Sequence, residues 1–444
     1  MPEEKENILE KVVSLCKRRG FVFQGSEIYG GVAGMWDYGP LGVALKNNIK
    51  NHWWQTFVLG REDVFGLDAA IMMHPDVWEA SGHTVSFSDP LVECKLCHER
   101  FRADHRDVLE RHEATHATKK AEWSDPRVFN LLVEAELGAI EGEKSKIYLR
   151  GEITQGVHVN FKNIVDAMHP RIPFGVAQIG KAFRNEITPA NFLFRLREFE
   201  QMELQYYVRP EEKEARDYFE YWKKQTLEWY LSLGFKKENI RSRQHEKSEM
   251  AHYARDAWDI EYNSLPHGWR EMCGIHNRGN WDLARHSEYS KKNLSYYDDE
   301  KKEWFVPWVI ETSGGLDRTF LFLLMDAYTE DEINGERRSY LALEASLAPV
   351  KVAVFPLLRN KAKLVQKARE VHALLKKKIP ETVFDDNGNI GKRYRRQDEI
   401  GTPACVTIDF DTLENETVTV RDRNTGRQER VAIHELASRL LRGA

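Results

Sequence analysis

Two arginines lie in segments whose other residues indicate buried structure, and this feature constrains the fold of the chain most strongly. Arg184 follows an alternating apolar segment that begins near residue 175, and Arg318 begins a nearly all-apolar helical run over 319–328. A guanidinium stays ionised at every ordinary pH, so it is retained beside a core only where an anion neutralises it. The pattern therefore predicts an anionic partner for both arginines.

Length and composition describe a globular protein that lacks the overall positive charge common in nucleic-acid-binding proteins. The 444 residues can bury a large core and are enough for two or three domains, with 41% hydrophobic and 30% charged residues. The net charge of -5 provides no general basic field, so any contact with nucleic acid must come from local patches.

The cysteines and the apolar runs indicate the compartment. Five cysteines, scattered except for Cys94 and Cys97, argue against a disulfide scaffold and for a reducing environment. No apolar run approaches the ~18 residues of a membrane span, and the first residues are acidic without a hydrophobic signal region. We therefore expect a cytoplasmic protein that does not enter membranes.

The order of elements predicts two domains, the first of which carries an insertion. Apolar side chains at four-residue spacing predict a helix over 41–57, and the charged composition of residues 88–148 indicates an inserted segment. Beyond Pro349 the pattern of strand, helix and strand restarts, so we expect a first domain over 1–346 and a small α/β domain over 349–444. We further predict strands at 153–161, 175–187, 195–208, 258–262, 269–275, 304–310, 350–355 and 404–410, and helices at 218–233, 319–328, 360–378 and 434–441.

The strands around Arg184 predict a polar sheet face. Arg184 and Glu186 point to one side, and a loop centred near 191 places Arg184 roughly opposite Phe199 on the returning strand. That strand presents on one face Arg195, Arg197, Phe199, Gln201 and Glu203. A guanidinium can grip phosphate, a ring can stack on a purine, and a carboxylate can accept from an exocyclic amine. Taken alone, the pattern also fits an exposed hairpin with paired charges, although a solvated face fits poorly at Arg318.

A possible metal site lies in the inserted segment. Cys94, Cys97, His112 and His116 follow the spacing C-x2-C-x14-H-x3-H, which is close to that of a zinc finger. The alternative is that the cysteines are vestigial and the histidines lie on a solvated helix.

A basic cluster lies in the predicted second domain. It contains Lys392, Arg393, Tyr394, Arg395 and Arg396. Such a cluster can hold phosphates and stack an unpaired base of a nucleic acid. The alternative is an ordinary solvated surface.

Several segments resemble glycyl-tRNA synthetases of the dimeric single-chain type. Phe183-Arg184-Asn185-Glu186, residues 195–203 and Gly315-Leu316-Asp317-Arg318 are similar to the second and third signature motifs of class II aminoacyl-tRNA synthetases. Residues 34–42, 102–105, 155–161 and 391–394 agree, so the resemblance extends from about residue 20 to 435. It implies an α+β fold with an antiparallel sheet flanked by helices over 1–346, an α/β anticodon-binding domain over 349–444, and a homodimer built through residues 36–57.

The resemblance also implies roles for individual residues. The catalytic residues that it implies are Arg184, Arg318 and Glu311. The ATP site consists of Arg184, Asn185, Glu186, Phe194, Arg195, Phe199, Glu271, Met272, Gly315 and Arg318, with Glu271 helping to ligate Mg²⁺. The glycine pocket consists of Arg102, Glu152, Phe199, Gln201, Glu203, Glu311 and Ser313. Three carboxylates around one ammonium group would leave no room for a side chain, which selects glycine by exclusion.

The implied reaction converts glycine and ATP to glycyl-adenylate and then transfers glycine to the 3′ end of tRNA(Gly). Gly151 and Thr312 stand where the family usually has proline, which bears on how rigidly Glu152 and Ser313 are held. A non-catalytic, synthetase-like accessory protein that binds tRNA or DNA is the alternative, but such a relative would be expected to lose the phosphate arginines. A synthetase for another amino acid is disfavoured by the three carboxylates.

Overall fold

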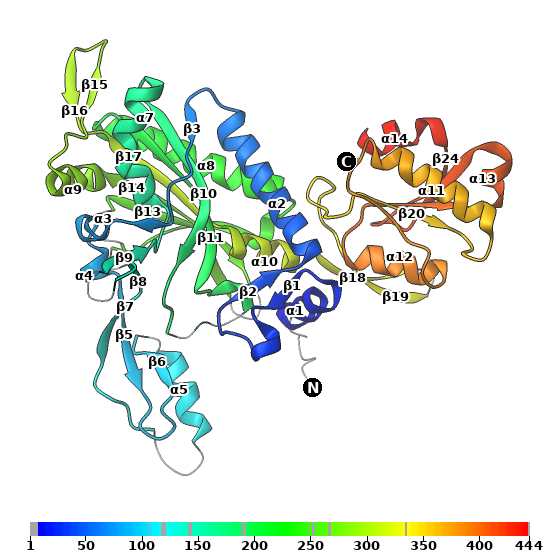
Figure 1. The fold of residues 1–444 in the computed structure, drawn as a ribbon, viewed down its shortest axis with the longest axis horizontal. Coiled ribbons are helices and arrows are strands. Elements are labelled where there is room, and N and C mark those ends of the chain that lie inside the picture. The colour runs from blue at the N-terminus through cyan, green and yellow to red at the C-terminus, as the bar shows by residue number, and fades with distance from the viewer. Residues whose placement is uncertain are drawn as a thin grey trace.

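The structure is a computed structural model that describes residues 8–104, 106–116, 121–140, 144–187, 189, 192–247, 249–250, 254–264, 268–333 and 335–442. Its largest feature is a seven-stranded sheet with helices on both faces, and a smaller body built on a five-stranded sheet lies at one end (Figure 1). Among the described residues, no helix is both long enough and apolar enough to cross a bilayer.

The central sheet is antiparallel except at one edge. The strand order is β12-β13-β14-β17-β11-β10-β3, and β3 pairs in parallel with β10. The strands are β3 (Val64–Gly66), β10 (Phe174–Phe183), β11 (Glu198–Val208), β12 (Ile240–Gln244), β13 (Asp256–Asn263), β14 (Trp269–Gly279) and β17 (Trp308–Gly315). The predicted α+β class with a flanked antiparallel sheet is confirmed.

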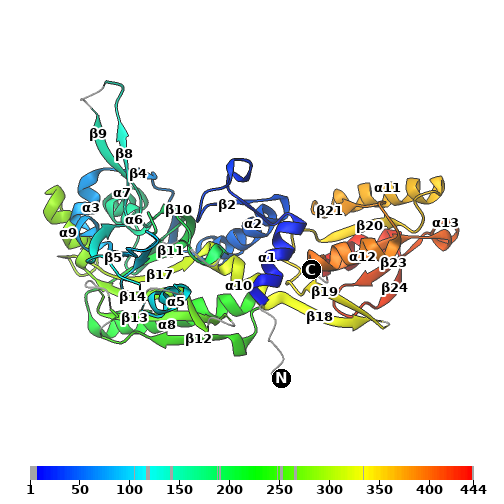
Figure 2. The same ribbon diagram turned by 90° about the horizontal axis from the view of Figure 1, so that it is seen from below.

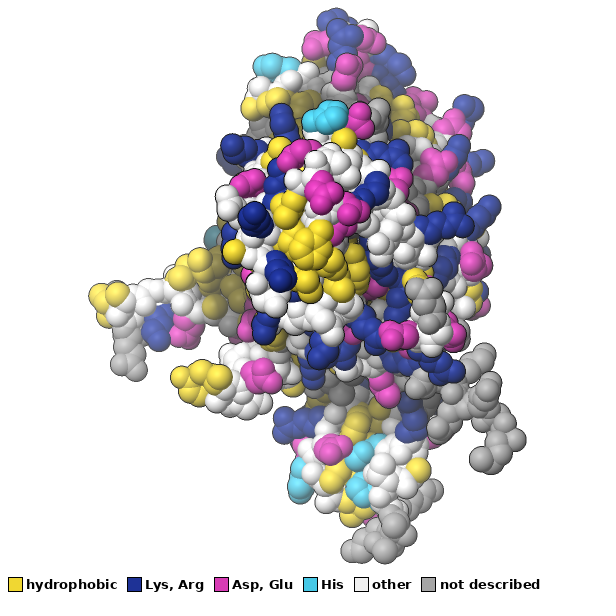
Figure 3. Space-filling model, turned by 90° about the vertical axis from the view of Figure 1, so that its right-hand side faces the viewer, with side chains coloured by type: hydrophobic (Ala, Val, Ile, Leu, Met, Phe, Trp, Pro, Cys, Tyr) yellow, Lys and Arg dark blue, Asp and Glu magenta, His cyan; other side chains and the backbone are white. Residues whose placement is uncertain are grey.

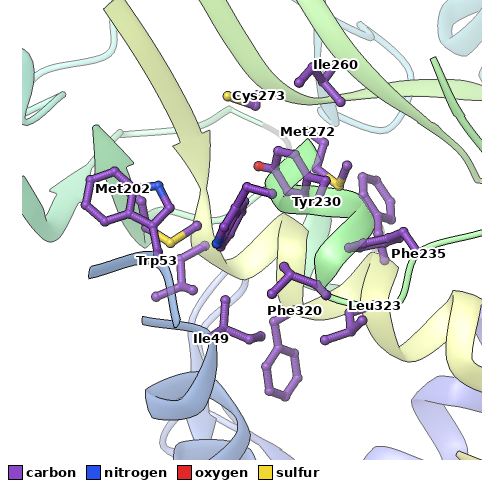
Figure 4. Packing of buried hydrophobic residues seen from close by; sticks show 14 of the residues in the cluster. Ile49, Trp53, Met202, Tyr230, Phe235, Ile260, Met272, Cys273, Phe320 and Leu323 are labelled. Atoms are coloured by element: carbon purple, nitrogen blue, oxygen red, sulfur yellow. The ribbon is translucent and has the colours of Figure 1, made fainter. Parts of the chain in front are cut away.

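Side chains alternate between two apolar cores along the strands. On β11, Met202 and Leu204 point to one face and Tyr207 points to the other. The first face is covered by α1 (Ile8–Arg19), α2 (Pro40–Trp54), α8 (Glu212–Ser232) and α10 (Leu316–Ala327), and the second by α6 (Thr154–Val159), α7 (Phe161–Met168) and α9 (Trp281–Ser290). Figure 4 shows the first core, in which Trp53 of α2 and Phe320 of α10 lie in one cluster with Met202.

The inserted segment and the residues before it form two small sheets outside the central one. Their orders are β4-β9-β8 and β6-β5-β7. The elements are β4 (Met72–Met73), α3 (Pro75–Ala80), α4 (His83–Ser86), β5 (Ser88–Glu93), β6 (Arg100–Arg102), α5 (Arg106–Thr115), β7 (Arg127–Asn130), β8 (Val133–Leu137) and β9 (Ser145–Leu149). Figure 1 shows β5, β6 and α5 extending from the body, and Figure 2 shows the β8–β9 hairpin projecting in another direction.

Short elements connect the larger ones. They are the hairpins β1–β2 (Val22–Gln24, Trp36–Tyr38), β15–β16 (Tyr296–Asp298, Glu303–Phe305) and β18–β19 (Tyr328–Ile333, Glu336–Leu341), the 3-10 turns η1 (Glu27–Tyr29), η3 (Phe192–Phe194) and η4 (Lys237–Asn239), and the π-helical turn η2 (Gln55–Leu59). The β18–β19 hairpin follows α10 directly and lies beside the C-terminal body in both Figure 1 and Figure 2.

The C-terminal body is a mixed sheet with helices on both faces. The order is β21-β20-β22-β23-β24, with β20 parallel to both β21 and β22. The elements are β20 (Val352–Pro356), α11 (Ala362–Lys376), β21 (Thr382–Phe384), α12 (Ile390–Glu399), β22 (Ala404–Ile408), α13 (Phe410–Asn415), β23 (Thr417–Asp422), β24 (Gln428–Ala432) and α14 (Ile433–Arg442). An apolar core separate from that of the central sheet joins this sheet to α11 and α14.

The prediction of a strand over 153–161 is wrong, because these residues form helix α6 and the start of α7. Ile153, Val157 and Phe161 are fully buried and lie four residues apart, which is helical spacing. The strand predicted over 404–410 ends at Ile408, since Asp409 caps α13 by accepting a hydrogen bond from the backbone N–H of Thr412.

The basic cluster on α12 also differs from its prediction. Arg393 is buried and donates to the carbonyl oxygens of Pro356, Asp386 and Gly388. The predicted contact with RNA is therefore wrong for Arg393, which serves the domain itself. Tyr394 is turned inward as well, with its hydroxyl 2.6 Å from Thr407 Oγ1.

Candidate active site

A cavity of about 480 Å³ lies on the second face of the central sheet, at the ends of its middle strands. On β11, Phe199, Gln201 and Glu203 line the cavity, while Met202 and Leu204 point into the hydrophobic core. Because alternate side chains of a strand point to opposite faces, this segment can supply a polar site and an apolar core at once.

The cavity brings together most of the residues that the sequence indicated. Its wall contains Arg102, Glu152, Arg184, Glu186, Phe194, Arg195, Phe199, Gln201, Glu203, Glu271, Glu311, Ser313, Gly315 and Arg318. Two predicted residues are not among those that line it. Asn185 is exposed and its N–H donates to Leu131 O at 2.8 Å, and Met272 is buried in the hydrophobic core.

Arg184 and Arg318 lie at one end of the cavity. Arg184 Nε donates to Gly151 O at 3.1 Å, and its guanidinium carbon lies 5.2 Å from the centre of the Phe199 ring. Arg318 Nε donates to Phe194 O at 3.2 Å and stacks at 4.7 Å from the Phe194 ring. Carbonyl and ring contacts orient both guanidiniums, and Arg318 also pairs with the Glu271 carboxylate at 3.0 Å.

The predicted pairing of Arg184 with Phe199 is displaced along the hairpin. Ala182 pairs with Phe199, and Arg184 N–H donates to Arg197 O. Three residues of the loop, 188, 190 and 191, lie outside the described part of the chain. The guanidinium still reaches the Phe199 ring, because diagonal neighbours on one sheet face are within range of a long side chain.

The same end of the cavity holds two more arginines and a carboxylate. Burial, together with repulsion from Arg102 and Arg318, lowers the pKa of Arg195, although Glu186 opposes this shift. Glu186 Oε2 is buried, accepts no hydrogen bond, and lies 3.9 Å from Arg195 Nε. Clustered guanidiniums and an unsatisfied acceptor indicate a site built for a ligand with both an anionic part and a donor.

Three buried carboxylates form the other end. Burial and repulsion from Glu311 and Glu152 raise the pKa of Glu203 to about 8. Burial also disfavours charge on Glu152, but His83 and Arg278 outweigh it and lower the pKa of Glu152 to about 2. Thr154 Oγ1 lies 2.5 Å from Glu203 Oε2 and 3.1 Å from Glu311 Oε1, so one hydroxyl bridges two of the carboxylates.

Arg278 favours the ionised forms of Glu311 and Glu152, and the sequence analysis missed it. Its guanidinium is 2% exposed, bonds Asp282 through Nε at 2.7 Å, and reaches Glu311 Oε2 at 3.1 Å. Burial works against charge on Glu311, yet Arg278 and His276 lower its pKa well below the ordinary range. Extending the strand predicted at 269–275 by three residues would have found Arg278 on the face of His276.

A β-bulge brings Glu271 to the cavity. Glu261 pairs with Glu271 and Ile260 with Cys273, so Met272 is the extra residue. The bulge turns Met272 and Cys273 into the core and leaves Glu271 on the face of His276. There Glu271 Oε2 accepts a hydrogen bond from Arg318 Nη1 at 3.0 Å. Desolvation raises the pKa of Glu271, but the positive charge of Arg318 outweighs this effect, so the pKa is lowered.

The predicted metal ligands meet at a separate site between β5, β6 and α5. Cys94, Cys97, His112 and His116 offer ligand atoms that lie within 4.8 Å of one another. Cys94 Sγ is 3.5 Å from His116 Nε2, Cys97 Sγ is 3.4 Å from His112 Nε2, and the two Nε2 atoms are 3.1 Å apart. Around a tetrahedral zinc ion, sulfur and nitrogen ligands lie about 3.5 Å apart and two nitrogen ligands lie about 3.3 Å apart. The distances between the four side chains therefore fit such an ion.

We expect the raised pKa of Glu203 to make stability depend on pH. Its ordinary pKa is 4.5 and its folded pKa is about 8, so the folded protein holds a proton that the unfolded chain releases. The free energy of unfolding should therefore fall as pH rises between these values. Glu203→Gln cannot titrate and should lose this part of the slope, as measured by calorimetric unfolding temperatures from about pH 6 to about pH 8.

Glu198→Gln is the matched control, since Glu198 lies on the same strand at the protein surface and pairs with Lys181. It should follow the wild-type slope. Identical slopes for Glu203→Gln and wild type would mean that Glu203 is ionised in the folded protein.

Comparison with protein families divides the chain at residue 350. The model described as "tRNA synthetase class II core domain (G, H, P, S and T)" matches residues 138–350. The model described as "Anticodon binding domain" matches residues 351–442, which contain the C-terminal sheet.

Curated relatives match along nearly the whole chain. The glycine–tRNA ligase of Thermobifida fusca is 48% identical over an alignment 454 positions long. The alignment covers 97% of this chain and 97% of that protein. The glycine–tRNA ligase of Treponema denticola is 48% identical over 444 residues, covering 99% and 97%. That of Borreliella afzelii is 49% identical over 434 residues, covering 97% and 96%. The chain therefore belongs to the glycine–tRNA ligases, a family of class II aminoacyl-tRNA synthetases.

Proposed function

We propose that this chain activates glycine with ATP and transfers it to the 3′ end of tRNA(Gly). The observation that carries the proposal is the division of one cavity into two ends. The charge of Arg195 interacts with those of Arg102 and Arg318, the carboxyl group of Glu203 interacts with those of Glu152 and Glu311, and both groups line the same cavity together with Arg184. Cations suit a triphosphate, and carboxylates suit an ammonium group, so the two reactants of glycine activation would meet between them.

Activation needs alignment more than it needs a protein nucleophile. The glycine carboxylate attacks the α-phosphorus of ATP, a bond from carboxylate oxygen to phosphorus forms, and pyrophosphate leaves with the electrons of the broken bond. Arg184, between Phe199 and Gly151 O, is placed to hold the reacting phosphate and the glycine carboxylate. Fixed guanidiniums stabilise the charge that develops on phosphate oxygens, at little cost in reorganisation.

ATP would lie between two aromatic–arginine layers. Phe199 offers a ring face to the purine, and Arg318 with Phe194 would cover its other side. Glu186 Oε2 is a buried acceptor that receives no hydrogen bond from the described residues and lies 3.9 Å from Arg195 Nε, which suits the exocyclic amine of adenine. Mg²⁺ bound with ATP would neutralise phosphate charge, and the half-exposed Glu271 carboxylate beside Arg318 is the proposed protein ligand.

Selection of glycine would follow from crowding. Ser313 Oγ donates to Glu203 Oε1 at 2.6 Å, and Gln201 Nε2 donates to the same oxygen at 2.8 Å. These contacts hold Glu203 in place, so an amino acid with a side chain would displace a buried, bonded carboxyl group. Losing such bonds costs about 1–3 kcal/mol each, which is enough to favour glycine.

The C-terminal body is the proposed reader of the anticodon, in keeping with its family model. Figure 3 faces this end of the molecule and shows Lys and Arg side chains scattered among Asp and Glu around an apolar patch. A mixed surface of this kind favours recognition of particular bases over general attraction to phosphate. The free cysteines fit the reducing cytoplasm as the place of action.

The proposed assembly is a homodimer through residues 36–57, which include α2. Ile28 and Tyr29 of η1 are each 87% exposed, which is unusual for large apolar side chains in a monomer. A second copy of this chain is the proposed occupant, because the resemblance implies a dimer through residues 36–57, and η1 precedes that segment in the chain. Sedimentation equilibrium should give twice the chain mass of 51.8 kDa, and a single-chain mass would contradict the proposal.

Glycine-dependent exchange of pyrophosphate into ATP tests the activity directly. Arg184→Ala and Arg318→Ala should each lower the exchange rate at least about a hundredfold, which is ~3 kcal/mol of transition-state stabilisation. The physical reason is that each guanidinium is placed to neutralise phosphate charge that increases in the transition state.

Arg171→Ala is the matched control, because the Arg171 side chain is 89% exposed and lies outside the cavity. It should exchange at the wild-type rate. Wild-type protein without glycine-dependent exchange would instead favour the non-catalytic, synthetase-like alternative.

Zinc is the proposed ion for the four-residue cluster in the insertion. Purified protein should contain about one zinc per chain, and Cys97→Ser or His112→Asn should lose it, since each removes a ligand from a tetrahedral set. Metal content is measured by mass spectrometry after dialysis under conditions that protect thiols.

His98→Asn is the matched control for His112→Asn. His98 is a neighbouring exposed imidazole that pairs with Glu93 and lies outside the cluster. It should keep the metal, and loss of zinc in neither ligand variant would refute the site.

A further inference from the structure

We infer that Arg338 is a positioning residue that fixes the anticodon-binding domain relative to the catalytic cavity, so that anticodon contact increases the rate of charging. The inference rests on the proposed function and adds to it how the two domains are coupled. It concerns a buried polar junction that the active site does not use.

Arg338 lies on β19 and is 9% exposed. Its Nε and Nη2 atoms bond the two carboxylate oxygens of Asp331 on β18, at 2.6 Å and 2.9 Å. Nη1 donates to Asp398 Oδ2 on α12 at 3.0 Å, and the remaining donors reach Arg423 O at 2.7 Å and Asn424 O at 3.0 Å. All five N–H groups of this guanidinium are therefore used, on both sides of the junction.

The partner carboxylate belongs to the core of the C-terminal body. Asp398 is 1% exposed and is held from the other side by Arg421, through two bonds of 2.7 Å and 3.0 Å. Arg423 extends the junction, since its Nη2 donates to Leu343 O at 2.7 Å and its Nη1 to Gly401 O at 2.6 Å. A planar, multiply bonded guanidinium fixes direction as well as distance, which a single ion pair would not.

The hairpin that carries Arg338 is continuous with the active site. Helix α10 begins beside Arg318 in the cavity, is buried along its length, and ends at Ala327, where β18 begins. Figure 1 and Figure 2 both show β18 and β19 leading from α10 to the C-terminal body. The orientation of that body is thus tied to the element that carries a phosphate arginine.

A fixed junction has a consequence for an RNA that contacts both domains. Contacts at the anticodon can lower the barrier to charging only if they place the 3′ end near the activated glycine. If the junction were loose, part of the binding free energy of those contacts would be used to order the two domains. Arg338 is proposed to remove that cost by holding the domains before RNA binds.

Arg338→Met tests the inference with the full chain. Methionine has similar length, Asp398 keeps Arg421, and Asp331 remains partly exposed, so no carboxylate is left buried and unpaired. Arg337→Met is the matched control on the adjacent, exposed side chain of the same strand. We measure glycine-dependent exchange, charging of full-length tRNA(Gly), and charging of a hairpin RNA that carries the acceptor arm alone.

We expect Arg338→Met to lower kcat/KM for full-length tRNA at least tenfold, while exchange and acceptor-arm charging stay within twofold of wild type. Small-angle scattering should show a larger radius of gyration for this variant, and Arg337→Met should match wild type throughout. Unchanged charging of full-length tRNA by Arg338→Met would overturn the inference. An equal decrease in the charging of both RNAs and in the exchange rate would also overturn the inference, because it would indicate a merely structural role for Arg338. Absence of exchange in wild type would instead overturn the proposed function.

Discussion

The polar site depends on one buried guanidinium. Arg278 bonds Asp282 of α9 and Glu311 of β17, and so joins a helix to the middle of the central sheet. Arg278 is the main cation that holds Glu311 ionised beside Glu203, and it assists His83 in holding Glu152 ionised, against the burial and mutual repulsion that favour protonation. With it, Glu203 alone takes up the proton, and a cluster of acids becomes a defined binding surface.

The rest of the site follows from the two-residue period of the strands. On β11 and β17 one set of side chains packs into the core and the alternate set faces the cavity, so Glu203 and Ser313 are held by the same packing that holds Leu204. The bulge at Met272 breaks this period once and thereby places Glu271 against Arg318. Positions on rigid strands keep ligand groups within small tolerances, which charge-based chemistry requires.

The sequence indicated most of the cavity, and the omissions have physical causes. Arg184, Arg318 and Glu203 could be predicted from the sequence, because a charged residue among apolar residues requires a partner in any fold. Arg278 was missed because it lies beyond the predicted end of its strand at residue 275, and because Glu311, one of its two carboxylate partners, comes from a distant segment. The helix at 154–159 was predicted as a strand, because a helix of 6 residues is too short for its four-residue spacing to be distinguished from an alternating pattern.

What the sequence determined by itself is local: which segments are apolar, where a strand can present polar groups, where a chain restarts as a second domain, and which four Cys and His residues can share a metal. The tertiary structure decided the rest. It set the offset between Arg184 and Phe199, turned Met272 inward and Glu271 outward, buried Arg393, and tied Arg338 to Asp398. The reason is that register, bulges and buried charge pairs depend on contacts between distant segments, whereas propensity and periodicity depend only on near neighbours.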